Sequence, residues 1–399
     1  MTDVRDSATS IDVFGRAQRP SRERRPRRPR ELSSSDILTM LGCCASSICF
    51  CLLVFQVLTD GVGWFGFGLA VFGVFLLLLY VVTADQIGRT AAADRVASAI
   101  VVTGAAALLV PLVWILLYVL FKGLDALRPS FFFHDQRGVT PILPATAGGG
   151  SHAVIGTLQQ VGLALLWSLP LAVLCAVFLN ESRSRWRRLV RIFVDAMSGL
   201  PSVLAGLFIF AVLILPFAKD FSLFSYNGFM ASLALAMIMV PTITRTVEVV
   251  LRLVPDGLRE ASLALGSSRA RTVWSVVLPT ARTGITTAVI LGIARAVGET
   301  APLFFTAFGY DLMNNNPFNG PQESLPLFVY RNIHKPDLSA VARGFAGALV
   351  LMIIVLLLFG LARYIGRDRS RRGARRAARR ATVPASPMAD LVVRGEGEQ

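Results

Sequence analysis

The sequence is poor in lysine, histidine and cysteine, and this excludes several kinds of chemistry. Its lysines are Lys122, Lys219 and Lys335, and none of them follows a glycine. A phosphate-cradling P-loop needs Gly-Lys followed by Ser or Thr, so this chain is not expected to hydrolyse ATP. The 3 histidines and 5 cysteines show no metal-ligand spacing, and no nucleophile–base set is present. We therefore predict no metal site, no catalytic residue and no enzyme.

Charge is also scarce and unevenly distributed. Charged residues make up 16% of the 399 residues and hydrophobic residues 54%, and the mean hydropathy is +0.60. The net charge is nevertheless +15, because arginines are concentrated in two segments, from Arg5 to Arg30 and from Arg363 to Arg394. A nucleic-acid-binding protein would need a basic folded face. Here the basic segments flank apolar runs, so no nucleic-acid partner is predicted.

Apolar runs dominate the rest of the chain. Runs of about 20 residues are long enough to cross a bilayer as helices. They lie near residues 37–59, 64–83, 97–121, 152–180, 189–218, 227–251, 283–308 and 341–364. The sequence therefore predicts an all-α membrane protein with about eight transmembrane helices.

The basic residues between these runs predict the topology. Of the 40 lysines and arginines, 31 fall in the segments 1–36, 84–96, 181–192, 252–282 and 362–399. Lysine and arginine mark the cytoplasmic side of spanning helices. We therefore expect a multi-pass protein of the cell membrane with both termini in the cytoplasm.

Arg295 and Glu299 lie inside the seventh run, four residues apart. This spacing predicts that both point to one face of the helix, and charges at this depth should face the bundle or a water-filled passage. A guanidinium offers a planar pair of donors to an oxyanion. Arg295 is thus a candidate for a substrate pathway, with Glu299 as its resting partner and Thr300 as a further donor. The alternative is that the pair only links helices.

Two other polar positions are candidates for the same pathway. Arg245 and Glu248 lie three apart near the end of the sixth run, and a local ion pair or a snorkelling side chain is the alternative to a transport role. Ser202 follows Gly199-Leu200-Pro201 in the fifth run. It either lines the passage or belongs to a region where small residues let helices pack closely.

A short polar helix is predicted between the sixth and seventh runs. Asp256 is a suitable N-cap, the helix would cover residues 257–265, and Gly266 would end it in the left-handed conformation. Such a slim helix, with the basic Arg259 and the acidic Glu260, suits insertion into a groove on a partner protein. The alternative is a helix lying on the membrane surface.

This stretch resembles the cytoplasmic loop of ABC-importer permeases, which carries an EAA…G…LP pattern. The matching residues are Glu260-Ala261, Gly266 and Leu278-Pro279, and Ser262 replaces the usual second alanine. ARAVGETAPLFFTA (residues 294–307) and GPQESLP (residues 320–326) are similar to PstA-type permeases of phosphate importers. The resemblance implies a type I ABC-importer permease core, with these loop residues coupling it to an ATPase: Arg259, Glu260, Ala261, Ala264, Gly266, Leu278 and Pro279.

The resemblance also implies a domain layout. It predicts a permease core over 97–364, with the best match over 152–364 and a coupling loop over 256–279. An extra transmembrane hairpin over 37–84 and Arg-rich cytoplasmic tails over 1–36 and 365–399 lie outside this core. The first tail lacks periodicity and is expected to be disordered. The second either marks topology or binds anionic lipid headgroups.

The implied function is ATP-driven import of inorganic phosphate. The partners would be a PstC-like second permease subunit, a PstB-like ATPase dimer, a PstS-like external phosphate-binding protein and the surrounding membrane lipids. This chain would need no cofactor, since ATP and Mg²⁺ would be bound by the ATPase. Two alternatives remain open at this point: a permease for sulfate or molybdate, and a gradient-driven anion transporter.

Overall fold

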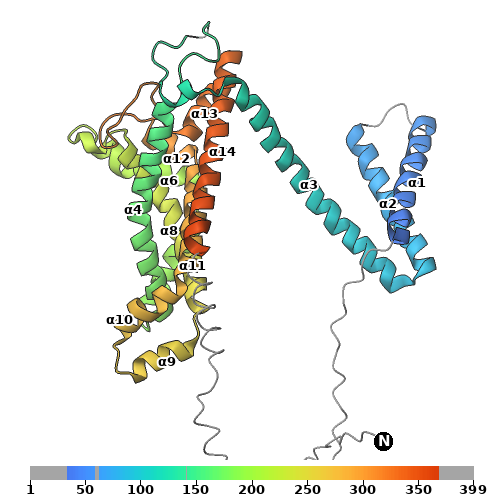
Figure 1. Ribbon diagram of the computed structural model, residues 1–399, viewed down its shortest axis with the longest axis horizontal. Helices are drawn as coiled ribbons and strands as arrows, with labels where there is room; N and C mark the ends of the chain where they lie inside the picture. The colour runs from blue at the N-terminus through green and yellow to red at the C-terminus, as the bar shows by residue number, and fades with distance from the viewer. Residues whose placement is uncertain (1–33, 59–62, 141, 368–399) are drawn as a thin grey trace, which may run out of the picture. The chain divides into compact units, whose positions relative to one another are not determined.

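The computed structural model describes residues 34–58, 63–140 and 142–367 (Figure 1). Nearly all of the two predicted tails, 1–36 and 365–399, therefore lies outside the described residues. In the described part every regular element is helical, which confirms the predicted all-α class. The longer helices are α1 (Ser34–Leu58), α2 (Trp64–Gln86), α3 (Arg89–Ala126), α4 (Ser151–Glu181), α5 (Trp186–Ser198), α6 (Ser202–Ile209), α8 (Gly228–Arg252), α9 (Asp256–Ala264), α11 (Leu278–Val297), α13 (Leu325–Ile333) and α14 (Leu338–Arg367).

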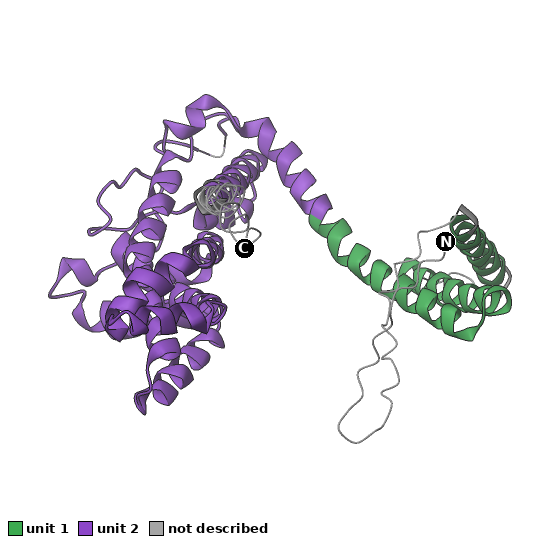
Figure 2. Cartoon of the chain, turned by 60° about the horizontal axis from the view of Figure 1, so that its bottom comes forward, with its two compact units in different colours: residues 1–112 green, residues 113–399 purple. Residues whose placement is uncertain are grey.

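Shorter elements join these helices. They are the turns η1 (Pro129–Phe132) and η3 (Ser222–Phe224), the π-helical segments η2 (Phe210–Ile214) and η4 (Val273–Val277), and the helices α7 (Leu215–Phe217), α10 (Arg269–Thr272) and α12 (Ala301–Thr306). The chain divides into two compact units, residues 1–112 and 113–399 (Figure 2).

The first unit contains the predicted N-terminal hairpin. Helices α1 and α2 pack against each other, with the rings of Phe55 and Phe67 meeting edge to face at 5.6 Å between centroids. Arg95 at the start of α3 forms an ion pair with Asp36 on α1. The first three helices are therefore tied together by both apolar and charged contacts.

The second unit is built around α8, which packs mainly against α4 and α11. Leu235, Met239, Ile243, Val247 and Leu251 recur every four residues along α8, and all are fully buried. This spacing puts them on one face of the helix. Glycines on α11 allow a close approach: a Cβ added at Gly292 would lie 2.6 Å from Ile243 Cγ1. Helix α11 is thereby held tightly against α8.

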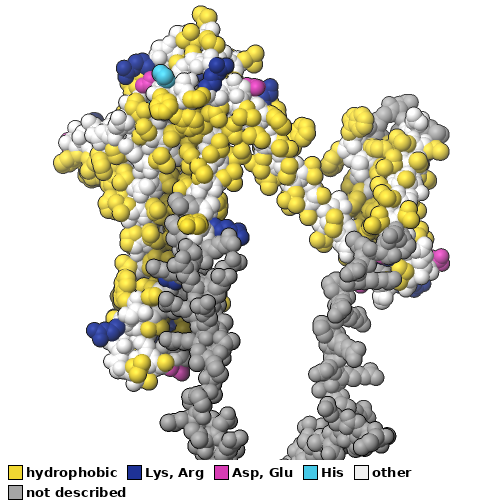
Figure 3. All heavy atoms as spheres, viewed as in Figure 1, with side chains coloured by type: hydrophobic (Ala, Val, Ile, Leu, Met, Phe, Trp, Pro, Cys, Tyr) yellow, Lys and Arg dark blue, Asp and Glu magenta, His cyan; other side chains and the backbone are white. Residues whose placement is uncertain are grey.

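Seven helices in the described part are long and apolar enough to span a membrane, or eight if one bent pair counts as a span. Figure 3 shows hydrophobic side chains over the flank of the second unit, with most charged side chains at its two ends. Exposed leucines such as Leu166, Leu171 and Leu357 would be costly in water. A lipid environment accounts for them, in agreement with the predicted number of spans.

The bent pair corrects the predicted fifth span, residues 189–218. Helix α5 and the helical stretch Ser202–Phe217 meet at 106°. The break falls at Gly199, Leu200 and Pro201, and Pro201 has an extended backbone (φ −56°, ψ 138°). Because proline lacks an N–H donor, the helix does not continue through it. The fifth apolar run is therefore bent rather than one straight span.

The predicted seventh span, residues 283–308, is also interrupted. A helical stretch begins earlier, at Arg269, and ends with α11 at Val297. Helix α12 begins at Ala301 with a proline in its first turn. Pro302 has no N–H to donate to the Gly298 carbonyl four residues earlier, and its ring would clash with that carbonyl in a continuous helix. Gly298 also has little helix propensity. The chain therefore breaks at residues 298–300.

Candidate functional site

Arg295 lies in the last turn of α11, next to α8. Its Nη1 donates a hydrogen bond to Thr242 Oγ1 at 3.1 Å. The close packing of Gly292 on Ile243, one turn before Arg295, brings the two helices within this reach. The α11–α8 contact therefore sets the position of the arginine.

The surroundings of Arg295 leave most of its donors free. Its side chain is exposed and borders a small cavity lined by Met197, Leu200, Ala205, Met237 and Ile238. Among the described residues no carboxylate pairs with it, although a guanidinium carries five N–H donors. A cation with free planar donors beside apolar walls is suited to bind an oxyanion.

Glu299 and Thr300 do not stand beside Arg295 as predicted. Both lie in the break after α11, where Glu299 is non-helical and Thr300 precedes α12. The expectation that Arg295 and Glu299 share one helix face is therefore wrong, because the helix does not continue between them. Across the described residues no ion pair joins their side chains. Both remain within five residues of Arg295, and their role in the pathway stays a prediction.

Ser202 begins α6, directly after the bend, and is half-buried. One turn later Gly206 packs on α12, where an added Cβ would lie 2.5 Å from Pro302 Cα and 2.7 Å from the Pro302 carbonyl oxygen. The predicted close approach of helices is present at Gly206. The structure does not place Ser202 in the cavity that Arg295 borders, so its lining role stays a prediction.

Arg245 belongs to a cluster of charges between α5 and α8. It forms an ion pair with Asp195, and its Nη1 lies 4.0 Å from Glu248 Oε2. The buried Glu248 also accepts from Arg191 Nη2 at 2.6 Å and Arg252 Nη2 at 2.5 Å. The geometry thus matches the ion-pair alternative, in which these charges hold α5 against α8. A transport role for Arg245 stays a prediction.

Helix α9 has the predicted length, but its N-terminal residue differs. The helix begins at Asp256 itself and Pro255 occupies the N-cap position without a side-chain hydrogen bond. The expected capping by Asp256 is therefore wrong, since its carboxylate instead accepts from Arg259 Nη1 at 2.8 Å. Gly266 has φ +82°, which confirms the predicted left-handed stop.

Arg259 faces the body of the protein rather than a partner. Its Nη1 donates to the Val254 carbonyl oxygen at 2.7 Å, and its Nη2 donates to the Leu251 carbonyl oxygen at 2.9 Å and to Glu181 Oε1 at 3.2 Å. These three oxygens, at the end of α8, just after it and at the end of α4, satisfy its guanidinium. A role for Arg259 in coupling to an ATPase stays a prediction. This residue anchors α9 to α8.

The opposite side of α9 is exposed. No residue of the helix is buried. The exposed residues on the side away from Arg259 are Leu258, Glu260, Ala261 and Ala264. An apolar strip on a thin, exposed helix is typical of a protein interaction site. Leu278 and Pro279 lie further on, at the start of α11.

Comparison with known proteins identifies the family. A family model described as "Binding-protein-dependent transport system inner membrane component" matches residues 168–371. The "Phosphate transport system permease protein PstA 1" of Mycobacterium tuberculosis (strain ATCC 25618 / H37Rv) is 37% identical over 283 residues, which cover 70% of this chain and 90% of the relative. The chain belongs to this family of permeases, among its PstA-type members. The family description places the permease in the inner membrane.

Two further proteins are similar to the permease. The "Probable phosphate transport system permease protein PstA" of Methanocaldococcus jannaschii is 32% identical over 272 residues, covering 67% of this chain and 92% of the relative. A solved structure of the MetNI methionine ABC transporter in an inward-facing conformation aligns with a TM-score of 0.41 and 21% identity, covering 54% of this chain and 92% of that chain. The relatives are named permease proteins, which confirms that the permease is a transport component and not an enzyme.

Sequence reasoning missed an ion pair that joins the segment 307–324 of the permease, which connects α12 to α13, to the helix α13. Glu323 is buried and its Oε2 accepts from Arg331 Nη1 at 2.5 Å, while Arg331 Nη2 also lies 3.3 Å from Asp311 Oδ1. Burial raises the pKa of the Glu323 carboxyl to about 7, against the opposing effect of the Arg331 guanidinium. The only hint in the sequence was a single acid within GPQESLP.

The same segment is bound to α4 through amide side chains. Gln322 Nε2 donates to Gln159 Oε1 at 2.6 Å, and Gln160 Nε2 donates to Gln322 Oε1 at 3.2 Å. The backbone passes so close to α4 that a Cβ at Gly156 would lie 1.9 Å from the Glu323 carbonyl oxygen. The segment 307–324 is therefore held firmly over one end of α4.

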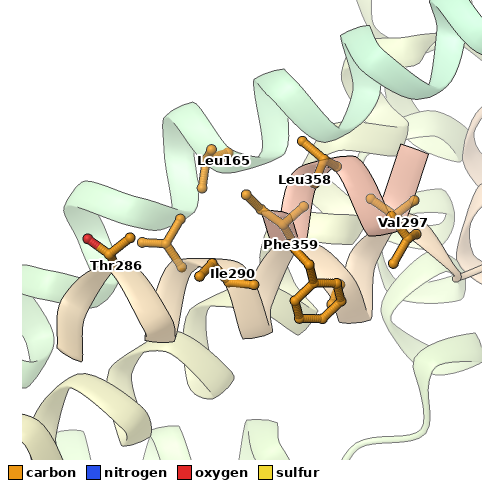
Figure 4. A pocket seen from close by; sticks show the side chains of 10 residues that line it. Leu165, Thr286, Ile290, Val297, Leu358 and Phe359 are labelled. Carbon is orange, nitrogen blue, oxygen red and sulfur yellow. The ribbon is translucent and has the colours of Figure 1, made fainter. Parts of the chain in front are cut away.

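A separate apolar pocket of about 290 Å³ lies between α4, α11 and α14 of the permease. Figure 4 shows its labelled side chains, which include Leu165, Ile290 and Phe359. Its lining contains no charged residue, and the Thr286 hydroxyl donates to the Arg282 carbonyl oxygen at 2.9 Å. Such a pocket has nothing to compensate an anion for its lost hydration, so it is not a candidate for the substrate site.

Proposed function

We propose that this chain is the membrane permease of an ATP-driven importer for inorganic phosphate. The observation that carries the proposal is its 37% identity across 90% of a phosphate transport system permease protein. Arg295 supports it chemically, because a guanidinium with free planar donors matches the oxygens of phosphate.

The importer has further subunits. The exposed strip of α9 is the contact for an ATPase dimer of the PstB type, which binds ATP and Mg²⁺, and this chain carries no cofactor. A PstC-like permease forms the other half of the passage, and a PstS-like protein delivers phosphate from outside. The positive charge of the segments around α5, α9 and both tails supports cytoplasmic termini.

Phosphate meets Arg295 during passage and is not held tightly. Binding must be weak enough for release, since a deep site would trap the ion. The hydrogen bond that Arg295 donates to Thr242 Oγ1 leaves the guanidinium oriented but not neutralised. Selectivity for phosphate is therefore expected to reside mainly in the external binding protein.

The test is uptake of radiolabelled phosphate by the complete importer in proteoliposomes. Uptake should require ATP, be blocked by vanadate and resist competition by sulfate and molybdate. Competition by either anion would favour the alternative cargo, and uptake without ATP would favour a gradient-driven transporter.

A matched pair of variants tests the site itself. Arg295→Gln should lower uptake by at least about 100-fold, because two charge-assisted hydrogen bonds contribute about 1.5–3 kcal/mol each. Arg282→Gln removes an exposed arginine from the same helix and should leave uptake unchanged. Equal uptake by both variants would remove Arg295 from the pathway.

A further inference from the structure

A second cavity, of about 820 Å³, lies at the end of the second unit that carries α9 and α10 (Figure 1). The last turns of α4, the start of α5, the end of α8 and the helices α9 and α10 contribute to its walls. One wall of the cavity is therefore the segment that contacts the ATPase under the proposed function.

The charges around this cavity are unbalanced. Arg252 is paired with Glu248, and Arg259 is paired with Glu181 and Asp256. The cavity is also lined by further arginines for which the described residues supply no carboxylate partner: Arg183, Arg187 and Arg269. Three unpaired guanidinium groups around one cavity attract an anion with several acceptor oxygens, such as a phosphate group.

The remaining wall is apolar and extends along α4. Leu174, Val177 and Phe178 line it, and Leu174 is 54% exposed. Leu174 precedes Glu181 by seven residues, which is about 10 Å along a helix. The cavity thus passes from arginines at the cytoplasmic end of α4 to a surface within the hydrocarbon region. A free phosphate ion would use the first part and leave the second uncovered.

We propose that this cavity binds an anionic phospholipid of the inner leaflet. Its headgroup phosphate lies among Arg183, Arg187 and Arg269, and an acyl chain lies along Leu174 and Phe178. Basic pockets between spanning helices on the cytoplasmic side are suited to anionic headgroups. The lipid contacts α4, α5 and α10 together, so it braces the base of α9.

The ATPase is the competing occupant, and the geometry places it elsewhere. The exposed strip of α9 includes Glu260, Ala261 and Ala264, which do not line the cavity. The ATPase can therefore contact α9 from outside while the lipid occupies the space behind it.

The experiment measures lipid retained by the purified full-length chain after extraction from vesicles of phosphatidylcholine and phosphatidylglycerol, using native mass spectrometry. The triple variant Arg183→Gln, Arg187→Gln, Arg269→Gln should retain phosphatidylglycerol at least ~10-fold less than the parent chain. The control variant Arg185→Gln, Arg188→Gln, Arg271→Gln loses the same charge outside the cavity. It should retain as much phosphatidylglycerol as the parent chain. Equal loss in both triples would reduce the effect to general surface charge and overturn the proposal.

Three further measurements distinguish a bound lipid from a free phosphate ion and from the ATPase subunit. Leu174→Asn changes an exposed position and keeps every arginine, so the chain should still fold. It should retain less phosphatidylglycerol because the acyl-chain contact is lost. Unchanged retention would contradict that contact. Displacement of the lipid by inorganic phosphate would assign the cavity to a free ion, and displacement by the ATPase subunit would assign it to the subunit interface. Lipid retention is measured without transport, so its failure leaves the proposed import function untouched.

Discussion

Replacing Gly206 with alanine tests how tightly α6 and α12 are packed beside the Arg295 site. The added Cβ would meet Pro302 Cα at 2.5 Å and the Pro302 carbonyl oxygen at 2.7 Å. Both are backbone atoms, so no side-chain rotation relieves the contact. Carbon atoms pack favourably at about 3.5–4.0 Å. The two helices must therefore separate by roughly 1 Å.

The size of the effect follows from this displacement. Overpacking of a well-packed region costs about 1–3 kcal/mol. The better helix propensity of alanine offsets at most about 1 kcal/mol of that cost. A net loss of about 1–2 kcal/mol corresponds to a melting temperature lower by roughly 2–8 °C for a unit of this size. Pro302 follows the break at residues 298–300, so uptake should fall as well.

Gly162→Ala is the matched control for this experiment. Gly162 lies in the interior of α4, and a Cβ there meets no atom within 4 Å. The same substitution should therefore raise stability by about 0.5–1 kcal/mol. Thermal unfolding of both variants in detergent, followed with a thiol-reactive dye, measures the difference. Equal melting temperatures for the two variants would refute the packing argument.

Three other variants address the charged sites. Arg295→Lys keeps the charge but loses the planar fork, so phosphate uptake should fall between the values for the parent and for Arg295→Gln; parental uptake would show that charge alone suffices. Glu323→Gln should flatten the pH dependence of stability, because folding raises the pKa of the Glu323 carboxyl to about 7. The contribution of this carboxyl to the free energy of unfolding is therefore fully present below about pH 4.5 and is lost as the pH rises through 7. The loss between pH 4 and pH 8 is at most about 3 kcal/mol. Melting curves that depend equally on pH in parent and variant would contradict this. Arg259→Gln should lower the phosphate imported per ATP hydrolysed by about 10-fold, whereas an unchanged ratio would show that the anchor of α9 is dispensable.

The spanning helices and the end of α9 could be predicted, because both depend on the types of residue in one continuous stretch of sequence. Hydropathy located the spanning helices because each must bury its backbone polar groups within one apolar segment. Gly266 was predictable because a single left-handed residue ends many helices and glycine adopts it without strain. The capping signals at Asp256 and Gly266 placed each end of α9 within one residue.

The direction of the chain after a helix break, and the groups that a side chain contacts, could not be predicted in the same way. The 106° bend at Pro201 lies between the amphipathic helix α5 and an apolar stretch, and a prediction from hydropathy joined the two into one run. The break before Pro302 has the same cause, and it separates Glu299 from the helix face of Arg295. The anchoring contacts of Arg259 could not be predicted, because they include the Leu251 and Val254 carbonyl oxygens, which only the tertiary fold brings near.

Helix α8 joins the two sites that the proposed function requires. Thr242 in its middle accepts from Arg295, and Leu251 near its end accepts from Arg259. Leu251 follows Thr242 by nine residues, which is about 14 Å along the helix, and that stretch is packed against α4 and α11 by fully buried side chains. A rigid element in a dense core transmits displacement rather than absorbing it. A movement of α9 driven by the ATPase therefore reaches the hydroxyl that orients Arg295, which is why loss of the Arg259 anchor should uncouple transport while leaving the arginine site intact.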